Sequence, residues 1–219
     1  MNVVLFDICG TIYQSNTTFD FLEYTFSNRQ SFKLYKGIYH TYLWKVLNKT
    51  LRQLFTYDLT RVIALKFLKG YKRDELIEKV EEYYDSFLKP RKNVAITNVI
   101  QKINEDRETR IILLSATIDV VAEVIASRLG LQEYYSTILE YQNGKCTGTI
   151  KKDLLGKKLT LVKNLDIESL ISSFYTDDFS DVPVLDIAKE KNIVVYPKYK
   201  KRWEKIIELR KWEVNYIEV

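Results

Sequence analysis

The chain has few of the residues that several common kinds of protein site require. Its only histidine is His40, and its only cysteines are Cys9 and Cys146. One histidine excludes a histidine-rich metal site and leaves almost no material for a Ser-His-Asp triad. Two cysteines are too few for a disulfide framework, so the chain fits a reducing compartment and we expect a cytoplasmic protein.

Glycine, proline and long apolar runs are also scarce. Seven glycines and three prolines argue against a long disordered linker. No run of 18 or more apolar residues occurs, so no membrane-spanning helix is predicted. The first residues lead directly into a predicted strand and lack the pattern of a signal peptide. The chain is 46% hydrophobic over 219 residues, enough for a sizeable core in one large domain or two small ones.

The charge of the chain is mildly positive, with a formal net charge of +5. This excess is compatible with solubility alone, with an anionic substrate, or with weak contact to an anionic membrane surface. No sharper feature indicates a nucleic-acid partner, so none is expected. The sequence gives no prediction of the oligomeric state.

The apolar pattern divides the chain into two parts. Residues 14–91 show helical periodicity and no strand-like run, with Asn16 or Thr17 as a cap for the first helix. From residue 92 onward, strands and helices alternate, which predicts a mostly parallel sheet. The strands expected there cover 110–115, 170–176, 192–196 and 212–217, with a hairpin over 136–150 that turns at Asn143-Gly144. The helices expected there cover 94–104, 119–129, a segment from about 157, 182–188 and 199–210.

The first apolar run, Val3 to Phe6, resembles a fully buried strand of the same sheet. The helical block therefore interrupts the sheet as an insertion. We predict an α/β protein whose Rossmann-like three-layer core is formed by residues 1–13 and 92–219. An all-helical cap domain over residues 14–91 is inserted into it.

Asp7 ends this first run, and Gly10 follows it with a predicted turn. Open α/β sheets bind ligands at the carboxyl ends of their strands, which is where Asp7 is expected. The alternative is an aspartate that only starts a turn. Ser115 ends the strand over 110–115, and Thr117 or Asp119 is expected to cap the next helix, whose amides then face an anion. A serine at a strand end can also be only a cap.

Three carboxylates, Asp177, Asp178 and Asp181, crowd one loop after a predicted strand. Such carboxylates repel one another unless a cation or a protonation change relieves them. Oxygen ligands suit Mg²⁺ rather than zinc. The alternative is a solvated acidic turn with a helix cap at Ser180 or Asp181.

These segments together resemble a known family. "FDICGT", from Phe6, is similar to the first motif of the haloacid dehalogenase-like superfamily, Asp-x-Asp-Gly-Thr. "LLSAT" resembles the second motif, and "YTDDFSDVPVL" the fourth, which is usually Gly-Asp-Ser-x-x-Asp. "GKCTGTI" followed by "GKKL" resembles the approach to the third-motif lysine. "LKGYKRDEL" and the last helix resemble the cap and tail of the phosphoserine-phosphatase-like branch, so the resemblance covers nearly the whole chain.

The resemblance implies a Mg²⁺-dependent phosphatase acting on a phosphorylated small molecule. It makes Asp7 the nucleophile that forms an aspartyl-phosphate. The implied metal ligands are Asp7, Asp177 and the backbone carbonyl of Cys9, and the implied phosphate-binding groups are Thr11, Ser115, the Ala116 N–H and a lysine. Asp178 and Asp181 would hold metal-bound waters or orient that lysine.

The motif lysine is either Lys157 or Lys158. We favour Lys158, because Leu159, Val162 and Leu165 follow it at helical spacing and place an apolar stripe beside it. Either lysine can also be read as surface charge.

Cys9 is the main departure from the family pattern, which has a second aspartate there as general acid and base. An unperturbed thiol has a pKa of about 8.5, so it donates a proton but replaces the carboxylate poorly in both steps. The alternatives are therefore a slowed phosphatase, a phosphoryl transferase on the same fold, or a weak relative that only binds a phosphorylated ligand or partner. Cys9 can also be a small buried residue that fills space.

The predicted cap carries aromatic and basic residues that either face a bulky anionic ligand or a lipid surface, or divide between the cap interior and its solvated face. They are Tyr35, Lys36, Tyr39, Tyr42, Trp44 and Lys45.

Overall fold

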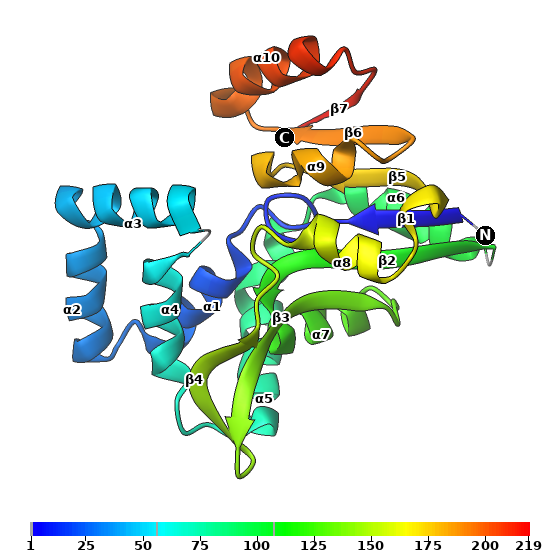
Figure 1. Ribbon diagram of the computed structural model, residues 1–219. Coiled ribbons are helices and arrows are strands. Elements are labelled where there is room, and N and C mark those ends of the chain that lie inside the picture. The colour runs from blue at the N-terminus through cyan, green and yellow to red at the C-terminus, as the bar shows by residue number, and fades with distance from the viewer. Residues whose placement is uncertain (1, 56, 107) are drawn as a thin grey trace.

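A central sheet organises the protein in the computed structural model, which describes residues 2–55, 57–106 and 108–219. Seven strands lie in the order β4-β3-β2-β1-β5-β6-β7 (Figure 1). All neighbours are parallel except the hairpin pair β3 and β4. The strands are β1 (Asn2–Phe6), β2 (Thr109–Ile118), β3 (Tyr134–Gln142), β4 (Lys145–Lys152), β5 (Ile171–Thr176), β6 (Glu190–Val195) and β7 (Asn215–Glu218).

Helices cover both faces of this sheet because its central strands are apolar on both sides. Val4 and Phe6 of β1 belong to an apolar cluster with α6 (Val94–Glu105) and α7 (Asp119–Arg128). Val3 and Leu5 belong to the cluster on the other face, with α8 (Lys158–Asn164), α9 (Val182–Leu185) and α10 (Lys200–Arg210). Each such fully buried side chain stabilises the fold by roughly 1.5–3 kcal/mol. The predicted α/β class with a three-layer, mostly parallel core is confirmed.

Within the described residues, five α-helices lie between β1 and α6 in the chain, and the first four of them lie at one side of the sheet in Figure 1. They are α1 (Thr17–Phe26), α2 (Gln30–Tyr39), α3 (Tyr42–Phe55), α4 (Leu59–Leu65) and α5 (Arg73–Tyr83), the last continued by a π-helical turn, Tyr84–Leu88. Phe21, Leu65 and Val80 from α1, α4 and α5 join the same apolar cluster as the sheet. The division of the chain into core and cap domains stays a prediction, since the two share this core.

Most expected elements are present within a few residues of their predicted bounds, and the predicted hairpin turns at Asn143-Gly144. Of two predictions about helix caps, the one for α7 is wrong and the one for α1 is confirmed in position. Neither Thr117 nor Asp119 caps α7, whose N-cap is Ile118 without a side-chain hydrogen bond. Asn16, one of the two expected residues, is the N-cap of α1, although its side chain forms no capping hydrogen bond. The threonines of this region bond to one another instead, as described below.

The expectation about membrane-spanning helices also has an outcome. Within the described residues, no helix is both long enough and apolar enough to cross a bilayer.

Candidate active site

The ends of β1 and β5 bring a lysine between two carboxylates. Nζ of Lys158, the first residue of α8, lies 2.9 Å from Oδ1 of Asp7 and 2.6 Å from Oδ2 of Asp181. Asp7 directly follows β1 and is 3% exposed, while Asp181 follows β5 and is 1% exposed. Thr176, the last residue of β5, donates a hydrogen bond of 2.6 Å to the same Asp181 oxygen. Residues far apart in sequence therefore form one buried charged group.

Burial and charge act against each other within this group. Burial raises the pKa of Asp7 above its usual value, and Lys158 opposes the rise. Burial also raises the pKa of Asp181, to about 7, with Lys158 again opposing. Burial alone would lower the pKa of Lys158, but Asp181 and Asp7 outweigh it and raise that pKa above the ordinary lysine value. Lys158 is therefore a permanent cation beside Asp7 at neutral pH.

A third carboxylate, Asp177, lies against the loop after β1. Thr11 donates a hydrogen bond of 3.3 Å to Oδ1 of Asp177. Gly10 has a φ of +69°, and a Cβ there would lie 2.1 Å from Oδ2 of Asp177. Only glycine therefore fits at this close approach. Burial and the neighbouring charge of Asp7 raise the pKa of Asp177 to about 8, so these carboxylates repel one another.

Ser115 lies inside β2 rather than at its end, because β2 continues to Ile118. The pairing of β2 with β1 stops at Leu113, and the register with β3 shifts between Leu114 and Ile118. Ser115 is 1% exposed and lines the same cavity as Asp7. Its hydroxyl favours the ionised form of Asp7.

The thiol of Cys9 forms a hydrogen bond to the first of three threonine hydroxyl groups that are bonded to one another. Its Sγ lies 3.0 Å from Oγ1 of Thr17, which lies 2.7 Å from Oγ1 of Thr117. Thr18 lies 3.0 Å from the same Thr117 oxygen. Burial and the charge of Asp7 raise the pKa of the Cys9 thiol to about 11, so the thiol is protonated at neutral pH. It is a proton donor there, and it is a poor base.

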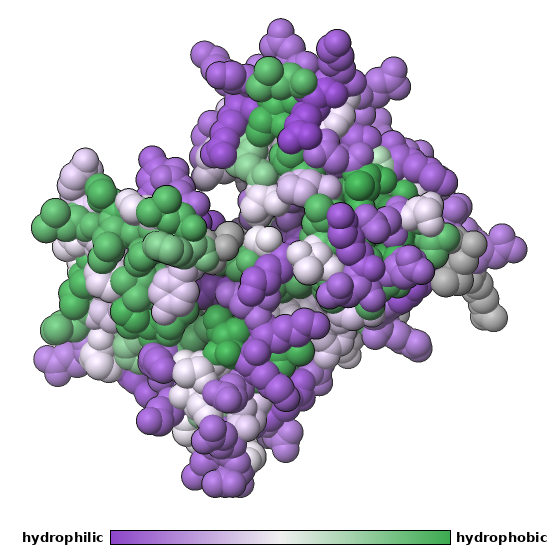
Figure 2. Space-filling view, in the orientation of Figure 1, coloured by the Kyte–Doolittle hydropathy of each residue, from purple (hydrophilic) through white to green (hydrophobic). Residues whose placement is uncertain are grey.

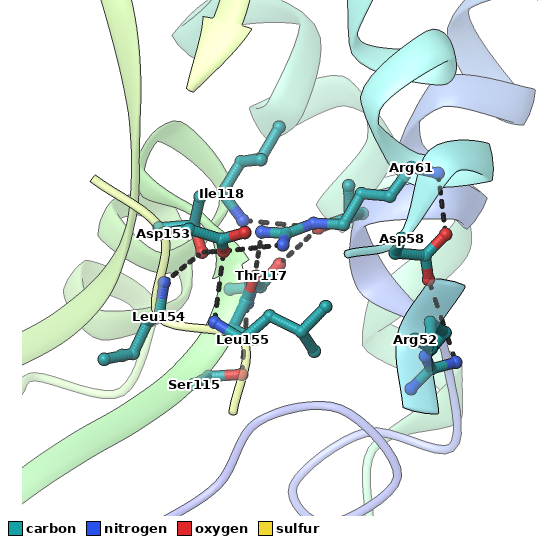
Figure 3. Close-up of polar contacts among 12 residues, drawn as sticks. Arg52, Asp58, Arg61, Ser115, Thr117, Ile118, Asp153, Leu154 and Leu155 are labelled. Carbon is teal, nitrogen blue, oxygen red and sulfur yellow. Dashed lines mark hydrogen bonds and ion pairs between the residues drawn. The ribbon is translucent and has the colours of Figure 1, made fainter. Parts of the chain in front are cut away.

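Arg61 reaches from α4 to the sheet (Figure 3). Its Nη1 donates a hydrogen bond of 2.8 Å to Oδ1 of Asp153, and its Nη2 donates one of 2.6 Å to the carbonyl oxygen of Ala116. Burial alone would raise the pKa of Asp153, but the charge and hydrogen bond of Arg61 outweigh it and lower that pKa. This buried cation ties the inserted helices to β2 beside Ser115.

Two adjoining cavities surround these groups. The smaller, of about 130 Å³, is lined by Asp7, Cys9, Ser115, Ala116, Lys158, Asp178 and Arg61, among others. The larger, of about 810 Å³, lies among α1, α3 and α4 and is lined by Phe19, Tyr39, His40, Trp44, Lys45 and Lys49, among others. Arg52 and Asp58, an ion pair of 3.7 Å drawn in Figure 3, line both cavities. A ligand at Asp7 therefore has space to extend toward the helical insertion.

The structure brings together most residues that the sequence singles out. Asp7, Cys9, Ser115, Ala116, Lys158 and Asp178 line one cavity. Asp181 pairs with Lys158, and Asp177 bonds to Thr11. Lys157 is exposed, whereas Lys158 is 7% exposed. The acidic loop is not a fully solvated turn, since Asp181 is buried. Asp178 accepts a hydrogen bond of 2.8 Å from the Ser180 amide.

The aromatic residues of the insertion divide between its interior and its surface. Tyr35 is buried, and Tyr42 is 79% exposed. Trp44 is partly buried and donates a hydrogen bond of 2.8 Å from Nε1 to Oγ1 of Thr60. Tyr39 and Lys45 line the larger cavity.

Sequence reasoning missed four groups at this site: Arg61, Asp153, the Arg52–Asp58 pair and the hydroxyl chain from Thr17 to Thr117. A helical arginine between apolar residues, as in "LTRVIAL", was the only signal for Arg61.

The fold and the site define an α/β protein with a lysine-paired acidic centre at the carboxyl ends of its parallel strands. Residues 4–186, most of the chain, match the family model of haloacid dehalogenase-like hydrolases. The chain therefore belongs to that family, and the resemblance seen in its motifs is confirmed.

Several individual proteins are similar to this chain. A Mycobacterium leprae protein named as a hydrolase is 32% identical over 130 residues, which are 57% of this chain and 43% of that protein. Phosphoserine phosphatase SerB1 of Mycobacterium tuberculosis is 30% identical over 130 residues, 57% of this chain and 42% of that protein. The matched segment thus spans less than half the length of these relatives.

Solved structures support the fold. A Bordetella pertussis protein of unknown function superposes with a TM-score of 0.76 at 21% identity, covering 98% of this chain and 97% of that one. A substrate-bound phosphoserine phosphatase gives a TM-score of 0.61 at 15% identity, covering 95% of this chain and 97% of that one.

Proposed function

We propose that the protein hydrolyses a phosphomonoester in a Mg²⁺-dependent reaction through an aspartyl-phosphate on Asp7. The observation that carries this proposal is the placement of Lys158 between Asp7 and Asp181 at the ends of β1 and β5. A buried cation beside a buried carboxylate keeps that carboxylate ionised and offsets its repulsion toward a phosphate. Two relatives with hydrolase and phosphoserine phosphatase names support the same chemistry.

The residues present fit a Mg²⁺ ion. Oδ1 of Asp7 is buried and, despite the nearby ammonium, receives no aligned hydrogen bond from the described residues. Asp177 adds oxygen ligands, and glycine at position 10 leaves room for them. No three His, Cys, Asp or Glu side chains within the described ranges form a metal site by themselves. Asp7, Asp177 and the carbonyl of Cys9 would therefore hold the ion, with water or phosphate oxygens. Bound there, Mg²⁺ supplies positive charge that offsets the charge of the phosphoryl group.

The protein's own residues would perform the two displacements as follows. A carboxylate oxygen of Asp7 bonds to phosphorus while the ester P–O bond breaks, and the departing oxygen takes a proton from Cys9. Lys158, Ser115 and the Ala116 amide hydrogen-bond the phosphoryl oxygens. In the second displacement, water attacks phosphorus, and Asp7 and inorganic phosphate are released. The proton lost by that water goes to the Cys9 thiolate left by the first step, or to bulk water where solvent has already reprotonated the thiolate.

The thiol of Cys9 favours a second candidate function. Because its pKa is about 11, a thiolate left by the first displacement is reprotonated from solvent at neutral pH before it can accept a proton from the attacking water. Water attack is then the slow step. The same site could instead transfer the phosphoryl group to another alcohol, or bind a phosphorylated ligand with little turnover. Neither alternative requires Cys9 to activate water as a base.

The cavities support a bulky leaving group. The larger one offers about 810 Å³, far more than a serine side chain needs, and it joins the catalytic cavity at Arg52 and Asp58. Lys45 and Lys49 line it and form no ion pair within the described residues. We therefore propose a phosphomonoester with a large, polar or anionic leaving group.

A panel of phosphomonoesters with and without Mg²⁺ tests the proposal. It includes an aryl phosphate, phosphoserine, fructose 6-phosphate, fructose 1,6-bisphosphate and a nucleoside monophosphate. We expect Mg²⁺-dependent phosphate release, with kcat/KM higher for the bulky esters than for phosphoserine. The absence of phosphate release from every ester, with tight binding of one of them, would favour the ligand-binding alternative.

A further inference from the structure

The consecutive helices α2 and α3 meet at a steep angle in Figure 1, and together they are called the α2–α3 hairpin below. This segment differs from the rest of the chain in its charge. Between Glu23 and Asp58 the chain contains no aspartate or glutamate, but it contains six basic residues: Arg29, Lys33, Lys36, Lys45, Lys49 and Arg52. The rest of the chain carries 28 Lys and Arg against 29 Asp and Glu. The whole positive excess of the protein is therefore concentrated in this hairpin and its flanks.

The same hairpin exposes large apolar side chains. None of the residues of α3 is fully buried. The side chains Leu34, Ile38, Tyr42, Leu43, Leu54 and Phe55 are 47–82% exposed. Figure 2 shows hydrophobic residues spread over the part of the molecule where Figure 1 has α2, α3 and α4, whereas polar residues dominate the rest of this view. Clustered exposure of this kind marks an interaction surface rather than scattered single residues.

Helix α3 separates its apolar and basic residues onto two sides. Leu43, Leu47 and Leu54 share one side, since residues four and seven or eight positions apart align on a helix. Lys45, Lys49 and Arg52, four and three positions apart, share the other side, which borders the larger cavity. Helices that lie in the plane of a membrane interface have an apolar side with leucine and aromatic residues and an opposite side rich in lysine and arginine. Helix α3 has this pattern.

We propose that the α2–α3 hairpin docks on an anionic lipid surface, with its exposed leucines inserted between headgroups. The positive charge of the hairpin favours an anionic lipid surface over a second copy of the chain as its partner. Basic residues near a membrane are attracted by anionic lipids. A second copy of the chain fits poorly, because a symmetric pairing through this hairpin would bring two basic surfaces together. Only Lys36 and Arg52 of the six basic residues form ion pairs within the described residues. The proposal does not depend on the catalytic function of the protein.

Co-sedimentation with vesicles tests this surface. The probes are vesicles of phosphatidylcholine alone and of phosphatidylcholine mixed with phosphatidylglycerol. We expect the protein to pellet with the mixed vesicles at about 0.05 M salt and to be released at about 0.5 M salt, because screening weakens the attraction. No pelleting with the mixed vesicles at low salt would overturn the proposal.

Matched variants locate the contact. Leu43→Glu combined with Leu54→Glu removes two inserted leucines, and we expect the vesicle partition coefficient to fall about tenfold or more. Leu209→Glu is the control, since Leu209 on α10 is 72% exposed and lies outside the hairpin. An equal loss in the control would show that the contact lies elsewhere and would overturn the proposal. Thermal unfolding of each variant checks that it is folded. Lys33→Glu is a further variant that changes only the charge, because Lys33 is exposed on α2 and its replacement removes no apolar contact.

Light scattering separates lipid binding from self-association. We expect the same molar mass for the wild type and for the double leucine variant. A wild-type dimer that becomes a monomer in the double variant, without vesicle binding by either, would identify the hairpin as an interface between copies and contradict the lipid proposal.

Discussion

Nζ of Lys158 lies 2.9 Å from Oδ1 of Asp7, although 151 positions separate the two residues in the chain. The contact joins the start of α8 to the end of β1, and Asp181 holds the ammonium from its other side at 2.6 Å. The lysine is thus fixed by two carboxylates before any phosphate enters.

Replacing this lysine should abolish most of the activity. Lys158→Met removes the charge that keeps Asp7 ionised and offsets the phosphoryl oxygens, so we expect the turnover of an aryl phosphate to fall about 10²-fold or more. Lys157→Met is the matched control, because Lys157 is exposed. Steady-state rates of both variants check this, and an equal loss in the two would contradict the assignment of Lys158.

Gly10→Ala should disrupt metal binding rather than only strain the backbone. A Cβ at position 10 would lie 2.1 Å from Oδ2 of Asp177, so the carboxylate has to move. Gly144→Ala is the control, since Gly144 also has a positive φ, +74°, but no neighbouring atom within 4 Å of its added Cβ. Each substitution should destabilise the folded state by about 1 kcal/mol, because alanine disfavours a positive φ. Calorimetric titration with Mg²⁺ should show weakened binding in Gly10→Ala alone, and equal affinities would refute this account of Gly10.

Cys9→Asp should raise turnover, because a carboxylate supplies the general acid and base that the thiol replaces poorly. General acid–base catalysis typically contributes about 10²- to 10⁴-fold, and we expect a gain of about tenfold or more for alkyl phosphates. Aryl phosphates should gain less, since their leaving group scarcely needs protonation. Rates on both ester classes measure this. A folded Cys9→Asp protein with less activity than the wild type would mean that the thiol itself takes part in another reaction.

The ion pair between Arg61 and Asp153 should make stability depend on pH. The folded pKa of Asp153 is lowered, so the pair contributes stability above the usual carboxyl pKa of 3.8, and this contribution is lost as pH falls through the lowered folded value. Because the Asp153 side chain is 28% exposed, Asp153→Asn should destabilise the protein by about 1–3 kcal/mol at pH 7, and the difference from wild type should shrink in acid.

Urea unfolding of the two proteins at several pH values measures this difference. Asp186→Asn is the control, because the Asp186–Arg210 pair, 2.7 Å apart, has side chains 31% and 48% exposed. A surface pair of this kind contributes about 0–1 kcal/mol. A deficit for Asp153→Asn that stays constant from neutral to acid pH would contradict the role of its charge.

The sequence was sufficient to predict the sheet and the place of Asp7 at the end of its first strand because those features are local. Val3 to Phe6 form a continuous apolar run, so Asp7 had to end a buried strand. The apolar spacing after Lys158 predicted which lysine turns inward, and in the structure Lys158 is the buried one of the pair. Gly10 signalled a turn, and the structure adds its close approach to Asp177.

Long-range contacts could not be predicted in the same way. Arg61 reads as one polar residue in a helix, and only the packing of α4 against β2 brings it to Asp153 and the Ala116 carbonyl. The expected cap of α7 failed for a related reason. Thr117 and Thr17 carry good capping side chains, but their hydroxyls bond to each other across 100 positions of sequence. The larger cavity depends on how α1, α3 and α4 meet, which no local pattern specifies.

Trapping the phosphorylated enzyme tests the central claim most directly. The wild type is mixed with an aryl phosphate and Mg²⁺, quenched in acid within the first turnovers, and analysed by peptide mass spectrometry. Because the Cys9 thiol activates water poorly, we expect phosphate to accumulate on Asp7, and we expect Asp7→Asn to show neither this label nor turnover. Full turnover by a folded Asp7→Asn protein, or a label on another residue, would contradict the account.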